Sequence, residues 1–176
     1  MFIFYLILLT FTLLILFPRQ IISYVGLETI KEQETVVYVD YNNYKCTLDS
    51  ISCKIYFVSK AYDLTKEQSL IAVAISKFET GNYTSSALKN NNNFGGNMEW
   101  TSQGSRLMNF ISEEEGLNFY IKNLKNNYFD KGLNTLADIQ PIYCPIGAEN
   151  DPTGINKYWL DGVTKVLNEI IEKGEF

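Results

Sequence analysis

The pattern of hydrophobic and polar positions predicts helices over most of the chain. Residues 63–81 predict a helix buried in the core, because the run from Leu70 to Phe78 is apolar on nearly every side. Thr65 and Gln68 have the spacing of a capping box at its start, and Gly81 suits a left-handed stop at its end. This element is better specified than the segments that precede it.

Further segments also have helical spacing. Residues 112–124 begin with a second capping box, formed by Ser112 and Glu115, and residues 134–140 predict a short helix that ends before a proline. The last predicted helix has an apolar face made of Trp159, Val163, Val166, Leu167, Ile170 and Ile171. Strand patterns are limited to the approach to this body and to a hairpin near residues 94–110. The predicted fold class is therefore mainly α, with a small β component.

The chain begins with an apolar segment. Residues 1–17 contain no charge, no glycine and no proline. As a helix this run falls a little short of the roughly 30 Å hydrocarbon core of a bilayer, and residues 21–27 extend it. No basic residue precedes Arg19 and no A-x-A-like triplet follows. We therefore predict a transmembrane anchor, or an uncleaved signal, over residues 1–26. A cleaved signal and a buried core helix are the alternatives.

The segment after the anchor is less regular. A charged stretch passes into an alternating run that ends near residue 44, which indicates a short strand or an extended linker. The apolar residues 54–62 are the first that suit the folded body, as strand or helix. We expect the body to begin between residues 45 and 60. The predicted division is a linker over residues 27–60 and one domain over residues 61–176.

Charge and composition exclude several functions. The net charge is −5 and the chain has no histidine. An acidic chain without basic clusters lacks the footprint that binds phosphates, so nucleic acid is not a predicted partner. Without histidine, Ser-His-Asp catalysis, Cys-His catalysis and most zinc enzymes are excluded. No CxxC pair is present, and we predict neither a metal nor a cofactor.

The three cysteines allow two interpretations. Cys46 and Cys53 enclose a short loop that suits a disulfide if the body is extracytoplasmic, which leaves Cys144 as the odd thiol. The alternative is three reduced thiols in a cytoplasmic protein.

Glu79 has an unusual position, in the last turn of the apolar helix. Burial and the negative end of the helix dipole both disfavour its ionised form, so we expect its pKa to be raised. A carboxylic acid that is still protonated near neutral pH is what a general acid requires, and glycoside cleavage is the common reaction that needs one. The alternative is a surface glutamate that points into water.

The loop after this helix, residues 90–96, reads "NNNNFGG". Its amides suit the hydroxyl and N-acetyl groups of sugars, and its two glycines let the backbone approach a polar ligand closely. An ordinary Asn/Gly loop is the alternative explanation.

Three segments together resemble a known family. "AISKFETGNYTSSALKNNNNFGG" at residues 74–96 is similar to the catalytic-helix motif of the glucosaminidase-type peptidoglycan hydrolases of the lysozyme superfamily. "FISEEEGLNFYIKNL" resembles the helix that follows the hairpin in that family, and "IQPIYCPIGAENDPTGINKYWLDGVTKVLNEI" resembles its closing segment. The match runs from about Tyr62 to Ile171. It implies a lysozyme-like α+β domain that cleaves the β-1,4 glycan strands of peptidoglycan.

The resemblance also implies roles for single residues. Glu79 falls at the catalytic acid, and Tyr143 at an active-site tyrosine that orients a water or the N-acetyl group. The predicted substrate-binding residues are Asn92, Asn93, Phe94, Gly95 and Gly96. Asp151, Asn156 and Trp159 match the closing segment, in functional or structural roles.

Two departures from the family pattern affect the predicted mechanism. Phe78 stands where many relatives have histidine, which favours a drier site. Relatives often carry a second carboxylate in the hairpin, and Glu99 is the acid available there. If Glu99 lies outside the cleft, the 2-acetamido group or the 6-hydroxyl of the substrate takes its place, the latter as in a lytic transglycosylase.

Peptidoglycan as substrate also determines the predicted location. Arg19 alone favours a cytoplasmic body, but the substrate requires the domain to face the cell wall. We therefore predict a single-pass protein of the cell membrane, or a secreted protein if the first segment is cleaved. A non-catalytic module that binds cell-wall glycan is the alternative function.

Overall fold

The computed structural model describes residues 45–46, 50–149 and 151–175. The predicted anchor, residues 1–26, lies outside the described residues, as does most of the predicted linker. The chain divides into two compact units, Met1–Leu48 and Asp49–Phe176, and the fold reported below is that of the second unit. Within the described ranges, no helix combines the length and the hydropathy that a membrane crossing requires.

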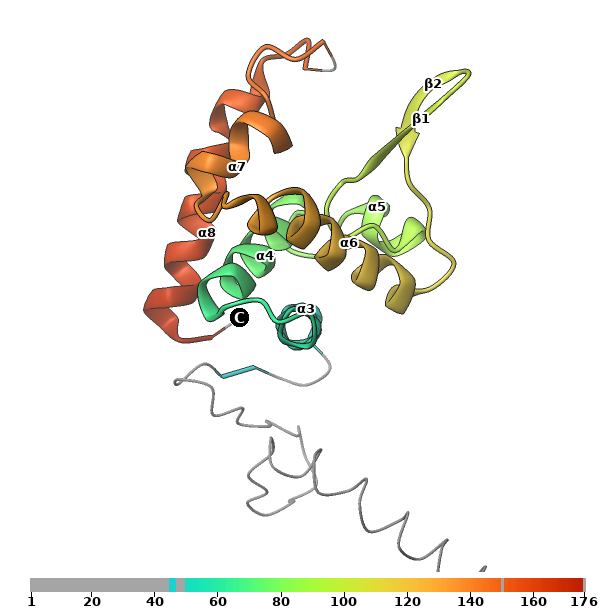
Figure 1. Ribbon diagram of the computed structural model, residues 1–176. Helices are drawn as coiled ribbons and strands as arrows, with labels where there is room; N and C mark the ends of the chain where they lie inside the picture. The colour runs from blue at the N-terminus through green and yellow to red at the C-terminus, as the bar shows by residue number, and fades with distance from the viewer. Residues whose placement is uncertain (1–44, 47–49, 150, 176) are drawn as a thin grey trace, which may run out of the picture. The chain divides into compact units, whose positions relative to one another are not determined.

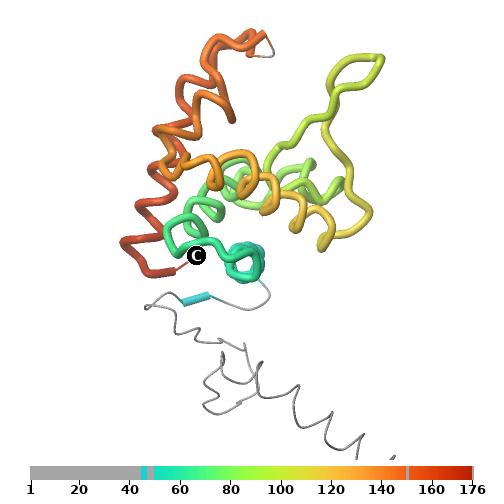
Figure 2. The backbone as a smooth tube through the Cα atoms, viewed as in Figure 1, coloured from blue at the N-terminus to red at the C-terminus, as the bar shows by residue number. Residues whose placement is uncertain are grey.

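The second unit is mainly helical, which confirms the predicted fold class at that level (Figure 1). Its α-helices are α3 (Ile51–Ala61), α4 (Lys66–Glu79), α5 (Ser86–Asn91), α6 (Glu113–Asn127), α7 (Leu136–Tyr143) and α8 (Trp159–Lys173). Two 3-10 helices, η1 (Phe129–Lys131) and η2 (Ile155–Tyr158), and two strands, β1 (Met98–Thr101) and β2 (Gly104–Leu107), complete it. The backbone trace in Figure 2 shows the two strands projecting from the helical body.

Helix α4 is the centre of the core, as its apolar sequence predicted. It packs against α3 and against α8. The predicted capping box is present, because the Thr65 side chain accepts from the Gln68 backbone and the Gln68 side chain accepts from the Thr65 backbone. Every residue from 69 to 76 is buried. This burial on all sides fixes the position of the last turn, where Glu79 lies.

A run of left-handed residues follows α4. Gly81, Asn82 and Tyr83 all have positive φ, at 56°, 56° and 64°. Gly81 confirms the predicted stop, and the two residues after it continue the same unusual conformation, which disfavours residues with a Cβ. The Tyr83 hydroxyl is hydrogen-bonded to the Ser52 hydroxyl of α3 at 2.8 Å, which anchors the end of this run.

One buried amide connects the next loop to the hairpin. Asn93 is fully buried, and its amide nitrogen donates to the carbonyl oxygens of Asn97 (2.8 Å) and Met108 (3.1 Å). Its amide oxygen accepts from the Asn97 backbone at 2.9 Å. The hairpin, predicted near residues 94–110, is an antiparallel pair in which Met98 faces Leu107.

Helix α3 begins within the segment that the sequence assigned to the linker. It starts at Ile51 with Ser50 as its N-cap, so residues 51–60 belong to the helical unit. Three of its five buried residues are polar or small: Ser52, Cys53 and Ser59. The start of α3 lies in the range predicted for the start of the body, residues 45–60, and its serines give the core-facing side no clear hydrophobic period, so the sequence left strand and helix open here.

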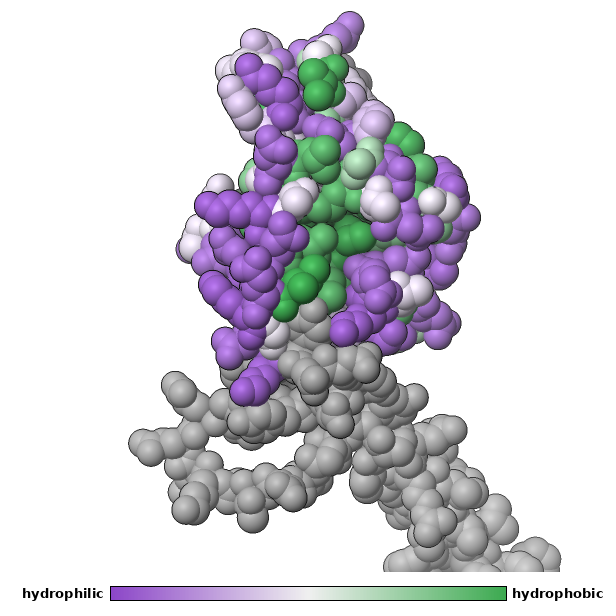
Figure 3. Space-filling view, turned by 90° about the vertical axis from the view of Figure 1, so that its left-hand side faces the viewer, coloured by the Kyte–Doolittle hydropathy of each residue, from purple (hydrophilic) through white to green (hydrophobic). Residues whose placement is uncertain are grey.

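The α8 side of the molecule has an uneven distribution of polarity. Figure 3 shows a band of hydrophobic residues with hydrophilic residues on both sides of it. Helix α8 itself buries Trp159, Val163 and Ile170, three residues of its predicted apolar face, whereas Ile171 of that face is exposed. This packing fixes the first residue of α8 against the last turn of α4.

Candidate functional site

The candidate site is centred on a contact between the end of α4 and the start of α8. The indole nitrogen of Trp159, the first residue of α8, donates to Oε1 of Glu79, the last residue of α4, at 2.6 Å. Trp159 is only 3 % exposed. The two residues are 80 positions apart in the sequence. The fold therefore holds one oxygen of the predicted acid in a fixed place.

The pKa of Glu79 is raised above its ordinary value, as the sequence predicted. Burial is the larger cause, since it disfavours the charged carboxylate, and the hydrogen bond from Trp159 opposes it by stabilising that charge. Burial prevails. Glu79 can thus hold a proton at a pH where an exposed glutamate has lost it.

Tyr143 lies beside this pair, at the end of α7. Its hydroxyl donates to the Gly95 carbonyl oxygen at 2.6 Å, and its ring centroid is 5.3 Å from that of Trp159. Burial, and next the charge of Glu79, raise the pKa of Tyr143 well above its ordinary value. The tyrosine is therefore a neutral hydroxyl donor that connects the 93–97 loop to the ring of Trp159.

Gly95 and Gly96 bring the backbone of the loop to this cluster. A Cβ on Gly95 would lie 2.7 Å from the ring of Tyr120 and 2.9 Å from the Tyr143 hydroxyl. A Cβ on Gly96, where φ is +62°, would lie 3.2 Å from Oε2 of Glu79. The loop thus approaches the second carboxyl oxygen through a residue without a side chain.

The other three predicted substrate-binding residues have internal contacts. Asn92 is a left-handed C-cap of α5, and its amide donates to the Phe110 carbonyl oxygen at 3.0 Å. The Asn93 side chain is committed to the base of the hairpin, and Phe94 is 1 % exposed. These side chains hold the shape of the loop, so its approach to Glu79 is made by backbone.

Glu99 lies in β1 and pairs across the hairpin. Its Oε1 is 2.7 Å from the Nε of Arg106 in a salt bridge, and its side chain is 37 % exposed. Among the described residues, the carboxyl of Glu79 is hydrogen-bonded to Trp159 and that of Glu99 to Arg106. Glu99 is also not among the groups that shift the pKa of Glu79. The two predicted carboxylates therefore have separate hydrogen-bond partners, and the role of Glu99 as second carboxylate stays a prediction.

Asp151 and Asn156 shape the turn before α8. The buried carboxylate of Asp151 accepts from the backbones of Ile155 (2.9 Å) and Asn156 (3.0 Å). The Asn156 amide donates to the Pro145 carbonyl oxygen at 2.8 Å. Both side chains have structural contacts that set where α8 begins, and hence where Trp159 stands.

Phe78 packs between the two helices that carry the acid and its partner. A Cβ on Gly162 of α8 would lie 2.3 Å from the Phe78 ring, so α4 and α8 approach closely only because residue 162 is glycine. The ring remains partly exposed. The position that holds histidine in many members of the resembled family is thus part of the α4–α8 interface.

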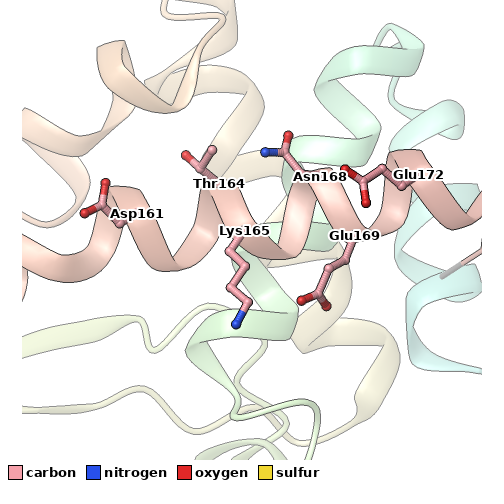
Figure 4. A pocket seen from close by; sticks show the side chains of 6 residues that line it. All are labelled: Asp161, Thr164, Lys165, Asn168, Glu169 and Glu172. Carbon is pink, nitrogen blue, oxygen red and sulfur yellow. The ribbon is translucent and has the colours of Figure 1, made fainter.

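A separate hollow lies along α8. It has a volume of about 410 Å³ and is lined by polar residues on one face of the helix, namely Asp161, Thr164, Lys165, Asn168, Glu169 and Glu172 (Figure 4). None of the predicted site residues lines it. In the part of the chain that the structure describes, no cluster of three or more His, Cys, Asp or Glu side chains could hold a metal ion.

No protein-family model matches the chain, and no curated protein is significantly similar to it. The resemblance drawn from the three sequence segments therefore stays a prediction.

Proposed function

We propose that this chain is a lysozyme-like peptidoglycan hydrolase that cleaves β-1,4 glycosidic bonds with Glu79 as the general acid. The observation that carries the proposal is the state of Glu79: its carboxyl is buried enough for its pKa to be raised, and a donor fixes one of its oxygens. This is the arrangement that protonation of a poor leaving group requires. The order of the three family-like segments supports the choice of substrate.

The proposed reaction begins with the neutral form of Glu79. Its proton moves to the glycosidic oxygen as the bond from that oxygen to C1 breaks, and the bonding electron pair stays on the departing oxygen. The sugar at C1 passes through an oxocarbenium-like state and takes up a water molecule. That water gives its proton to the Glu79 carboxylate, which restores the acid. Tyr143 holds the Gly95 backbone beside the acid during these steps.

The salt bridge of Glu99 favours a single-acid version of this mechanism. If Glu99, paired with Arg106 on the hairpin, does not reach C1, the positive charge that develops there needs another stabilising group. The 2-acetamido group of the substrate can supply it by attacking C1, or the 6-hydroxyl can do so and give an anhydro product. Substrate assistance is a recognised exception to the two-carboxylate rule.

We also propose that the domain faces the cell wall from a membrane anchor. The apolar residues 1–17 support the anchor. Cys46 and Cys53 are both disulfide-bonded, while Cys144 is free. Disulfides persist in oxidising compartments, which supports a body outside the cytoplasm.

Zymography on purified sacculi tests the proposal directly. Wild type should clear the gel, and Glu79→Gln should not, because glutamine keeps the shape and the indole contact but cannot donate an acidic proton. Glu114→Gln, the same change at an exposed position of α6, is the matched control and should clear like wild type. Equal clearing by Glu79→Gln and wild type would refute the role of Glu79. Mass spectrometry of the fragments separates a reducing GlcNAc end, a reducing MurNAc end and an anhydro end.

A second candidate function is a cell-wall glycan-binding module without turnover. The observation in its favour is the exposed Glu99–Arg106 pair, since it leaves Glu79 as the carboxyl at the candidate site. Co-sedimentation with sacculi measures binding independently of cleavage. Binding by wild type and Glu79→Gln alike, with no fragment released by either, would support this function over hydrolysis.

A further inference from the structure

The two oxygens of the Glu79 carboxyl have different surroundings. Oε1 receives the indole N–H of Trp159 at 2.6 Å, whereas Oε2 lies on the side of Gly96. An indole nitrogen can only donate, so the oxygen it faces must accept. In a neutral carboxyl the carbonyl oxygen is the better acceptor, and the proton then belongs on the other oxygen. The geometry thus distinguishes the two oxygens before any substrate binds.

Trp159 is itself held in a fixed orientation. It is buried, it is the first residue of α8, and its ring lies against Tyr143 with an interplanar angle of 30°. Tyr143 in turn is bonded to the Gly95 carbonyl oxygen, next to Gly96. Trp159 is thus held by the ring of Tyr143, and Tyr143 by the loop beside Glu79, so the N–H that faces Oε1 has a fixed place.

We propose that Trp159 is a positioning residue that holds Oε1 of Glu79 as the acceptor, so that Oε2, on the side of Gly96, carries and delivers the proton. This inference rests on the proposed function for its catalytic meaning. When the proton leaves Oε2, the negative charge that forms is met by an N–H already in place, and that hydrogen bond strengthens as the charge develops. The glycosidic oxygen must then meet Oε2 rather than Oε1.

The ionisable groups around Glu79 titrate at higher pH than Glu79 does, so its titration can be observed separately. Among the described residues, the ionisable groups whose pKa values respond to its charge are Tyr120 on α6, Tyr143 on α7 and Cys144 directly after α7. The pKa values of both tyrosines are raised well above their ordinary range, and burial first, then Glu79 and Asp151, raises that of Cys144 to about 11. All three groups are neutral where Glu79 titrates.

A fluorescence titration tests the contact without substrate. The chain has two tryptophans, and Trp100 is 83 % exposed on β1, so Trp100→Phe leaves Trp159 as the sole reporter. Its emission should show one transition, with a midpoint above the ordinary pKa of glutamate. The double variant Trp100→Phe/Glu79→Gln should lack that transition. A transition that persists in the double variant, or none in Trp100→Phe, would overturn the proposal.

Trp159→Phe tests the role in catalysis. Loss of one donor to a charged oxygen should lower kcat roughly tenfold to a hundredfold. The basic limb of the pH–rate profile should also move to higher pH, since the N–H lowers the pKa of Glu79. Mere loosening of the site would hydrate Glu79 and move that limb to lower pH, which would contradict the proposal. Trp100→Phe is the control and should keep kcat within about twofold of wild type.

The two experiments separate this inference from the proposed function. If wild type releases no fragment from sacculi, the hydrolase proposal fails. The titration then still decides whether the emission of Trp159 depends on the protonation of Glu79. If wild type is active and the emission is insensitive to Glu79, the positioning role fails alone. The titration variants leave Trp159 in place, so the result does not depend on whether Trp159→Phe folds.

Discussion

Gly96 and Glu79 approach each other so closely that a single methyl group fills the space between them. A Cβ at residue 96 would lie 3.2 Å from Oε2, on a backbone with a φ of +62°. The position is therefore restricted twice, by its left-handed conformation and by the carboxyl oxygen beside it.

Gly96→Ala should reduce turnover more than it reduces stability. The added methyl presses on Oε2 of Glu79 and displaces the carboxyl, so kcat on sacculi should fall by roughly tenfold or more, while the strained φ costs about 1 kcal/mol. Fragment release and chemical denaturation measure the two effects. Gly104→Ala is the control, because its φ is also positive but its Cβ would meet no atom within 4 Å. Equal loss of activity in both variants would show that strain alone is responsible.

The raised pKa of Glu79 predicts how stability depends on pH. Because the folded state holds the proton more tightly than the unfolded state, this group stabilises the fold fully below the unfolded pKa of about 4.3. That contribution is lost as the pH rises through the folded pKa. Glu79→Gln cannot ionise, so it should be more stable than wild type at pH values above this window and should lose the advantage below it. Urea denaturation across the range checks this, and a difference that is constant with pH would contradict it.

Asn93→Ala should be the most destabilising loop substitution. It removes a fully buried amide and leaves the carbonyl oxygens of Asn97 and Met108 without that donor. A loss of roughly 2–4 kcal/mol in the free energy of unfolding is expected, since each unsatisfied buried group costs about 1–3 kcal/mol. Asn90→Ala, exposed on α5, should change it by less than about 0.5 kcal/mol. A mild effect at Asn93 would mean that the hairpin base has other support.

Tyr143→Phe should affect the loop rather than the acid. The ring contact with Trp159 is kept, but the Gly95 carbonyl oxygen loses its donor. We expect a loss of about 1 kcal/mol in stability and a higher KM, as the 93–97 backbone shifts. Steady-state kinetics on soluble glycan fragments measure KM and kcat separately. A fall in kcat at unchanged KM would instead indicate direct participation of the hydroxyl in the reaction.

Glu99→Gln distinguishes the single-acid route from the two-carboxylate route. If the salt bridge with Arg106 is the only contact that matters, activity should stay within about threefold of wild type, since exposed pairs contribute little. A loss comparable to that of Glu79→Gln would identify Glu99 as the second catalytic group. Arg106→Gln is the matched variant, because it removes the same pair and keeps the carboxylate.

Sequence reasoning succeeded where the determinants are local. The core helix follows from its apolar run and capping box, and the raised pKa of Glu79 follows from its position in the last turn of that helix. The hairpin expected near residues 94–110 is also present, as the pair of β1 and β2. In each case, neighbouring residues carry enough information to specify the outcome.

The remaining features depend on distant partners. The indole of Trp159 meets Glu79 across 80 positions, and the only sequence signal is one aromatic donor at the start of an amphipathic helix. The loop asparagines have the amide groups that a sugar-binding site uses. The Asn93 amide nevertheless donates to the carbonyl oxygen of Met108, which lies on the far side of the hairpin in the sequence. Helix α3 buries Ser52 and Ser59, so its core-facing side does not show the hydrophobic spacing of an amphipathic helix. The sequence does not show whether a polar side chain faces solvent, a ligand or a backbone group of the protein.

The left-handed run at residues 81–83 also bears on how this scaffold can be altered. The run ends at Tyr83, which is bonded to Ser52, so the connection between α4 and α5 has a defined length as well as a defined shape. Adding or deleting one residue there should change the orientation of α5. Gly95 and Gly96, which follow α5, would then move away from Glu79. Families built on such a connection should vary in sequence around it while conserving its residue count, and a designer who grafts new loops should leave this one intact.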